Sequence, residues 1–252
     1  MSHPHSSSST PSKQNPTQQS TTAVEAAEDP NSIQAKEATI PKLRGMFHLL
    51  GAIACIPASY YLLMHVHQTH PTGDHWYFSA TMMYMLSLLL LMTSSAIYHV
   101  PKWPAATKAL LRRVDHAMIY VLIAGSLIPF IAVLDAQCPL YVIILLIANT
   151  IFGVVRSLFM NIQQRALRVI SYLVMGAIPV LLLPKMYDSL GHVILTWVIV
   201  GGIFYGVGAL IYTLKRPNPF PKVLGFHEIF HIFVNIAATC HFIAVWKTFN
   251  II

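Results

Sequence analysis

The chain has 252 residues, of which 55% are hydrophobic and only 10% are charged, and its mean hydropathy is +0.59. A soluble domain carries about 25% charged residues, so this composition argues against a soluble protein and indicates an integral membrane protein. The formal net charge is +7. The basic residues fall between apolar stretches and form no patch with interleaved aromatic residues, so no nucleic-acid partner is expected.

The first 40 residues differ in composition from the rest of the chain. They are rich in Ser, Thr, Gln and Pro and contain few large apolar residues. Such a segment buries too little apolar surface to offset its ordering entropy, and it lacks the apolar core of a signal peptide. We therefore expect residues 1–40 to be a disordered tail, followed by a membrane domain at residues 41–252.

Seven apolar stretches follow the tail, and each is close to the roughly 17–25 residues that a membrane-spanning helix requires. The fifth is the weakest, because Pro179 and Pro184 interrupt a short run. The sequence thus predicts an all-α integral membrane protein that forms a seven-transmembrane helix bundle. The expected spans are residues 46–66, 77–100, 116–134, 139–156, 167–184, 192–214 and 224–247.

The basic residues predict the orientation of this bundle. Of the 16 lysines and arginines, 14 lie in the tail and first flank or in the connections after spans two, four and six, and the other two are Lys185 and Lys247. These segments alternate in the chain, so they share one side of the membrane, and the positive-inside rule makes that side cytoplasmic. We expect a cytoplasmic N-terminus and an external C-terminus, in a plasma or inner membrane.

The last stretch carries the pattern His227-Glu228-Ile229-Phe230-His231. Two histidines four residues apart lie on one face of a helix and can share a metal ion, as in HExxH sites. Ionisable groups inside a membrane span are costly, so a functional site is the default interpretation.

Further metal-ligating side chains are expected at the same depth. The predicted orientation places His99 at the inner end of span two and Asp115 at the inner start of span three, level with the pair on span seven. Three imidazoles and a water make a zinc site with one open position. Asp115 would bind the metal or its water, and Ser95, one turn above His99, would orient that water or a ligand. The alternative is that each histidine only contacts headgroups or backbone.

Other histidines are weaker candidates. His241 lies about 15 Å along the helix from His231, too far to share one ion. His48, at the start of span one, would line the cavity or serve a structural role, and His116 points about 100° away from Asp115. The side chain of Glu228 points away from the two-histidine edge and is expected to meet Arg112 or Arg113. The cysteines at 55, 138 and 240 are expected to be ordinary buried thiols.

Three segments together resemble the hemolysin III family, which belongs with the progestin and adipoQ receptors. They are Ser95-Ala96-Ile97-Tyr98-His99, Asp115-His116-Ala117-Met118-Ile119-Tyr120 and the His227–His231 pattern. The resemblance implies a seven-helix barrel with a cavity facing the cytoplasmic leaflet and zinc ligands at His99, His227 and His231. It also implies that Asp115 and Ser95 line the metal water. His116 stands where the adiponectin receptors carry tyrosine, which favours the hemolysin III branch.

These features lead to a hypothesis of a zinc-dependent intramembrane hydrolase acting on a lipid amide or ester, similar to ceramidases. Asp115 and Ser95 would be catalytic, and the helix-bundle cavity would hold a lipid or fatty acid. A zinc-stabilised receptor-like or membrane-remodelling protein without turnover is the alternative. A metalloprotease using Glu228 is disfavoured, because no third ligand follows in the chain, and cytolysis would be an overexpression effect.

Overall fold

The computed structural model describes residues 41–70, 75–160 and 165–251, and the predicted tail lies outside these ranges. The described part of the chain is helical, with turns and one isolated β-bridge between Phe220 and Leu224. Its α-helices are α2 (Met46–Thr69), α3 (His75–His99), α4 (Ala105–Leu134), α5 (Leu140–Phe159), α6 (Arg165–Ala177), α7 (Leu183–Leu214) and α8 (Phe226–Thr248). Two short 3₁₀ segments, η2 (Asp135–Gln137) and η3 (Ile178–Leu182), follow α4 and α6.

Six helical segments of the described residues are long and apolar enough to cross a membrane. They are α2, α3, α4 extended by η2, α5, the continuous segment Ala166–Leu214, and α8. Large apolar side chains on their outer surfaces are exposed, for example Ile53 at 57% and Ile56 at 63%. A soluble protein would not leave so much apolar surface uncovered, whereas lipid covers it in a bilayer. The protein is therefore a multi-pass integral membrane helical bundle, as its composition predicts.

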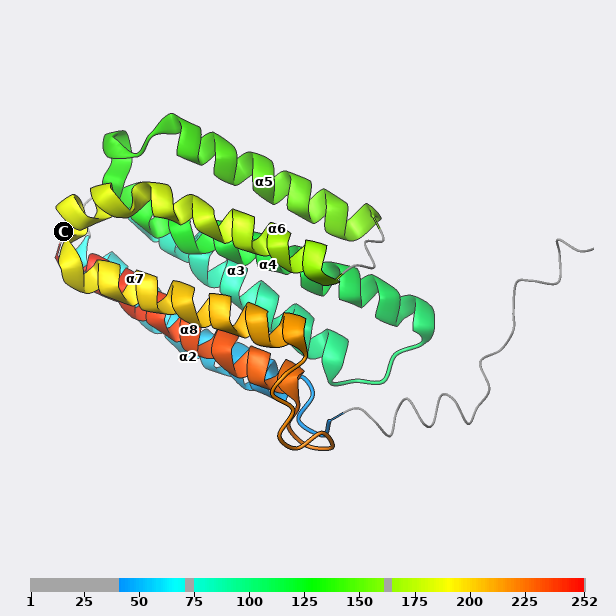
Figure 1. Ribbon diagram of the computed structural model, residues 1–252. Coiled ribbons are helices and arrows are strands. Elements are labelled where there is room, and N and C mark those ends of the chain that lie inside the picture. Colours follow the sequence, from blue (N-terminus) through cyan, green and yellow to red (C-terminus); the bar gives the residue numbers. More distant parts are fainter. Residues whose placement is uncertain (1–40, 71–74, 161–164, 252) are drawn as a thin grey trace, which may run out of the picture. The chain divides into compact units, whose positions relative to one another are not determined.

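The predicted fifth and sixth spans belong to one continuous helical segment. The first part is α6, which has only 13 residues, and Pro179 lies in the 3₁₀ turns of η3 that follow it. Within α7 the backbone of Gly191 departs from helical geometry, with φ 77° and ψ 171°. Figure 1 shows α6 and α7 running along the bundle in opposite directions. The predicted start of span six, residue 192, coincides with the break at Gly191.

The predicted third span, residues 116–134, is too short at its start. Helix α4 begins at Ala105, and Arg112 and Arg113 lie within it. Hydropathy detects only the apolar part of a helix, and the basic first turns of α4 belong to the same helix.

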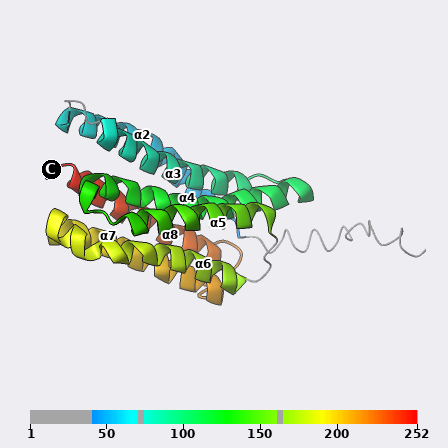
Figure 2. The same ribbon diagram turned by 90° about the horizontal axis from the view of Figure 1, so that it is seen from above.

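Sequence neighbours pack together in the pairs α2–α3, α3–α4, α4–α5 and α7–α8. Helix α2 also packs against α8, so the first and last described spans lie side by side (Figures 1 and 2). Apolar side chains of these helices form the main core, which includes Leu62, Val66, Tyr84, Met92, Phe130, Leu134, Leu182, Met186, Val245 and Phe249. The start of α2, the end of α3, the start of α4 and the start of α8 meet at one end of the bundle, because neighbouring helices alternate in direction.

Candidate metal centre

Helix α8 presents His227 and His231 one turn apart, as their spacing predicts. Their ring centroids are 4.6 Å apart. His231 is buried, with 2% exposure, and His227 is half-buried. Both rings lie in the first two turns of α8, which begins at Phe226.

The start of α8 is held by Glu228. Its Oε2 accepts a hydrogen bond of 2.8 Å from the backbone N–H of Gly225, the residue before the helix. Its other oxygen pairs with the Nε of Arg44, and the Glu228 side chain is fully buried. A carboxylate here satisfies a free N–H group and complements the positive end of the helix dipole. The prediction that Glu228 meets Arg112 or Arg113 was wrong. Its partner is Arg44, which lies just before α2.

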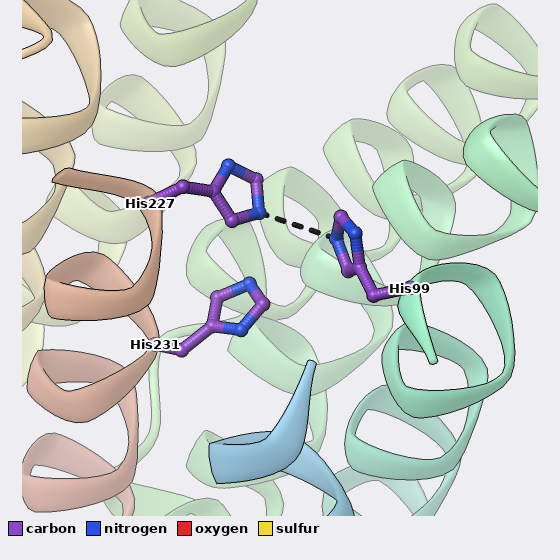
Figure 3. Close-up of side chains that lie close together, drawn as sticks. All are labelled: His99, His227 and His231. Atoms are coloured by element: carbon purple, nitrogen blue, oxygen red, sulfur yellow. Dashed lines mark hydrogen bonds between the residues drawn. The ribbon is translucent and has the colours of Figure 1, made fainter. Parts of the chain in front are cut away.

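Helix α3 brings the third imidazole, since His99 is its last residue. The Nε2 atoms of His99 and His227 are 3.2 Å apart, within hydrogen-bonding distance, and Figure 3 shows the three rings facing one another. The ring of His99 lies 5.2 Å from that of His231, centroid to centroid. Residues 128 positions apart in the chain thus converge, as the predicted common depth requires.

This cluster has the donor set of a transition-metal site. Each of His99, His227 and His231 offers one ring nitrogen, and the three atoms lie within 4.8 Å of one another. The Nδ1 atom of His231 is buried and has no hydrogen-bond partner among the described residues. Imidazole suits zinc and similar ions, whereas magnesium and calcium take oxygen ligands. The three residues therefore form a possible metal-binding triad.

The two other predicted site residues lie beside each other on neighbouring helices. The side chain of Ser95, buried in α3, hydrogen-bonds the carboxylate of Asp115 in α4. Asp115 is not one of the three clustered ligand residues. The predicted catalytic roles of Asp115 and Ser95 stay predictions.

Helix α2 adds a fourth histidine that the sequence left between two roles. The ring of His48 stacks on that of His231, with centroids 3.8 Å apart and planes 10° apart. His48 is 3% exposed, and neither of its ring nitrogens has a hydrogen-bond partner among the described residues. A clear signal was available, because His48 starts span one at the depth of the other three. Its ring lies directly against a member of the cluster.

Gly45 lets the start of α2 approach His99. Its φ is +81°, a conformation that other residues adopt only with strain. A Cβ atom at this position would lie 2.6 Å from the Cβ of His99. A residue with a side chain therefore does not fit here without displacing His99.

The remaining candidates lie elsewhere. The ring of His241 contacts that of Tyr205, with centroids 5.5 Å apart. His241 lies about 15 Å along α8 from His231, as expected. An apolar pocket of about 440 Å³ lies at the opposite end of the bundle, beside Gly191 and Trp246. All three cysteines are free and buried, as predicted.

Comparison with known proteins finds a family and several relatives of this chain. Residues 37–242 match the family described as "Haemolysin-III related". The chain is 30% identical over 188 residues to "Hemolysin-3 homolog" of Bacillus subtilis (strain 168), covering 74% of this chain and 84% of that protein. It is 27% identical over 187 residues to the human "Monocyte to macrophage differentiation factor", covering 70% of this chain and 73% of that protein. It is also 27% identical over 214 residues to "Adiponectin receptor protein" of Drosophila melanogaster, covering 77% of this chain and 47% of that protein.

The fold and the cluster together define the class of this protein, a helical membrane bundle with three clustered histidines at one end. The matched region contains all three histidines of the cluster. The chain belongs to the hemolysin III family, among the progestin and adipoQ receptors, and the resemblance seen in its motifs is confirmed.

Proposed function

We propose that this protein is a zinc-dependent intramembrane hydrolase that acts on a lipid amide or ester. The observation that supports it is the convergence of His99, His227 and His231, which come from helices α3 and α8, far apart in the chain. Three imidazoles leave one position of a tetrahedral zinc ion open, as in catalytic sites. The hydrogen-bonded pair of Ser95 and Asp115, from α3 and α4, supplies the acid–base group that hydrolysis needs.

The chain's own residues would divide the reaction between them. A bound zinc ion polarises a carbonyl oxygen and activates water near neutral pH. Asp115 takes a proton from the attacking water and returns it to the leaving group. The products are a fatty acid and an amine, or a fatty acid and an alcohol. Ser95 orients the Asp115 carboxylate and helps to hold the substrate oxygen.

The proposed topology has seven crossings, a cytoplasmic N-terminus and an external C-terminus. The 13 residues of α6 extend about 20 Å at 1.5 Å per residue, and the five of η3 add about 10 Å. Their sum matches the roughly 30 Å of a hydrocarbon core, so α6 with η3 is long enough for one crossing. The positive-inside rule then places the histidine cluster near the cytoplasmic headgroups, with acyl chains between the helices.

Metal analysis and lipid turnover test the proposal together. We expect about one zinc ion per chain in purified protein, and fatty acid release from ceramide in mixed micelles. Alanine at any clustered histidine lowers the zinc content, whereas His192→Ala, an exposed position in α7, leaves it unchanged. Asp115→Ala retains zinc and slows turnover at least about 100-fold, the usual contribution of a general base. Retained zinc with full turnover in Asp115→Ala would remove the assigned base.

A second function is favoured by the helices that the cluster joins. Helix α2 packs against both α3 and α8, and the contact of His99 with His227 joins α3 to α8 directly. A metal there would add stability to the bundle, as in a zinc-stabilised receptor-like or membrane-remodelling protein without turnover. Chelation would then lower the melting temperature, while ceramide and other lipid amides and esters remained intact.

A further inference from the structure

A second group of basic side chains lies at the same end of the bundle, outside the histidine cluster. Helices α4, α5 and α6 surround a small pocket there, with a volume of about 30 Å³. This volume holds about two water molecules, so it suits a compact polar group and not an acyl chain. The side chains that line the pocket include those of Arg112, Arg113, His116, Arg156, Ser157 and Arg168.

Arg156 is held in a fixed orientation by neighbours from two other helices. One terminal nitrogen, Nη2, donates a hydrogen bond of 2.6 Å to the hydroxyl of Tyr120 in α4 and also contacts the hydroxyl of Ser171 in α6. These two hydroxyls are themselves 2.6 Å apart. A guanidinium has five N–H donors, and the bonds named here use only Nη2. The side chain is half-buried, so its orientation is set before any ligand binds.

Tyr120 reaches this position because α5 has a glycine opposite it. A Cβ atom on Gly153 would lie 2.3 Å from the ring of Tyr120. The close approach fixes the tyrosine between α4 and α5, and Tyr120 in turn fixes the guanidinium of Arg156. The part of the pocket wall formed by Tyr120 and Arg156 is therefore held by packing between helices.

In the part of the chain that the structure describes, arginines outnumber carboxylates around the pocket. Only four carboxylates occur among the described residues. Glu228 pairs with Arg44, and Asp135 and Asp188 lie at the opposite end of the bundle, where α4 ends and α7 begins. Asp115, one turn from Arg112, is the only one close to the pocket. Among the described residues, four guanidinium groups line the pocket and one carboxylate lies beside it, an excess of positive charge that favours an anionic ligand.

We propose that this pocket binds a phosphate group. Arginine suits this role because its planar fork of donors matches phosphate oxygens. Basic pockets between transmembrane helices bind the headgroups of anionic phospholipids, and free phosphate offers the same chemistry. The proposed site uses no residue of the histidine cluster and does not depend on a bound metal.

Binding of defined ligands to the full chain in detergent tests the site. Binding of dioleoyl phosphatidylglycerol is compared with binding of dioleoyl phosphatidylcholine by native mass spectrometry. Binding of inorganic phosphate is measured by the rise in melting temperature that it causes. We expect tighter binding of the anionic lipid, weakened about 100-fold in Arg113→Gln/Arg168→Gln, because each of the two lost charge-assisted hydrogen bonds costs about tenfold. The matched control is Lys108→Gln, which removes one exposed charge from α4 outside the pocket and leaves binding unchanged.

The two sources of phosphate give different results. If the wild-type protein prefers phosphatidylglycerol and the arginine variant does not, the pocket binds a lipid headgroup. If inorganic phosphate stabilises the wild-type protein but not the same variant, the pocket binds a soluble phosphate. Arg112→Gln, at an exposed position of the pocket, provides a second variant if the double one does not fold. Equal binding of both lipids without stabilisation by phosphate would overturn the proposal, as would wild-type binding in every arginine variant that folds.

Discussion

Replacing Gly45 by alanine is expected to disturb the histidine cluster from outside it. The φ of +81° costs a residue with a side chain about 1–2 kcal/mol. The added Cβ would lie 2.6 Å from the Cβ of His99, whereas carbon atoms prefer about 3.5–4.0 Å. Relief requires a shift of about 1 Å, and overpacking of this kind costs about 1–3 kcal/mol. We therefore expect Gly45→Ala to lower the free energy of unfolding by about 2–5 kcal/mol.

The same shift should weaken metal binding. Metal–ligand distances tolerate only about 0.2 Å, so moving His99 by about 1 Å separates it from the nitrogens of His227 and His231. Unfolding in detergent and zinc content measure the two effects. The control is Gly202→Ala in α7, where an added Cβ meets nothing within 4 Å, and its stability should stay the same or rise. Wild-type stability and zinc content in Gly45→Ala would refute this account of Gly45.

Two further predictions concern the neighbours of the cluster. Glu228→Gln keeps an oxygen for the N–H of Gly225 but loses the charge that pairs with Arg44, so stability should fall by about 1.5–3 kcal/mol while zinc content and lipid turnover persist. Abolished turnover in a folded, zinc-loaded Glu228→Gln protein would instead support Glu228 as the base. His48→Ala removes the ring stacked on His231 and should weaken zinc binding about 10–100-fold, measured by competition with a chelator. His48→Phe restores the ring and should recover most of that affinity; no recovery would show that the nitrogens of His48 matter more than its stacking.

Much of this protein is determined by its sequence alone. The apolar stretches predicted the helices, because a bilayer core requires about 20 apolar residues in each crossing helix. The spacing of His227 and His231 predicted that their rings lie on one face of α8, since helix periodicity fixes that relation. His99 could be assigned to the same depth because span length and the distribution of basic residues set each helix end relative to the membrane.

Only the tertiary structure decided which side chains meet across helices. The rotation of a helix about its axis depends on packing with its neighbours, and hydropathy does not record it. The stacking of His48 on His231 and the pairing of Arg44 with Glu228 follow from α2 lying beside α8. The grouping of arginines around Arg156 likewise needs α4, α5 and α6 to meet at one end. Contacts between residues far apart in the chain are set by how the helices pack, and for that reason they appeared only in the folded protein.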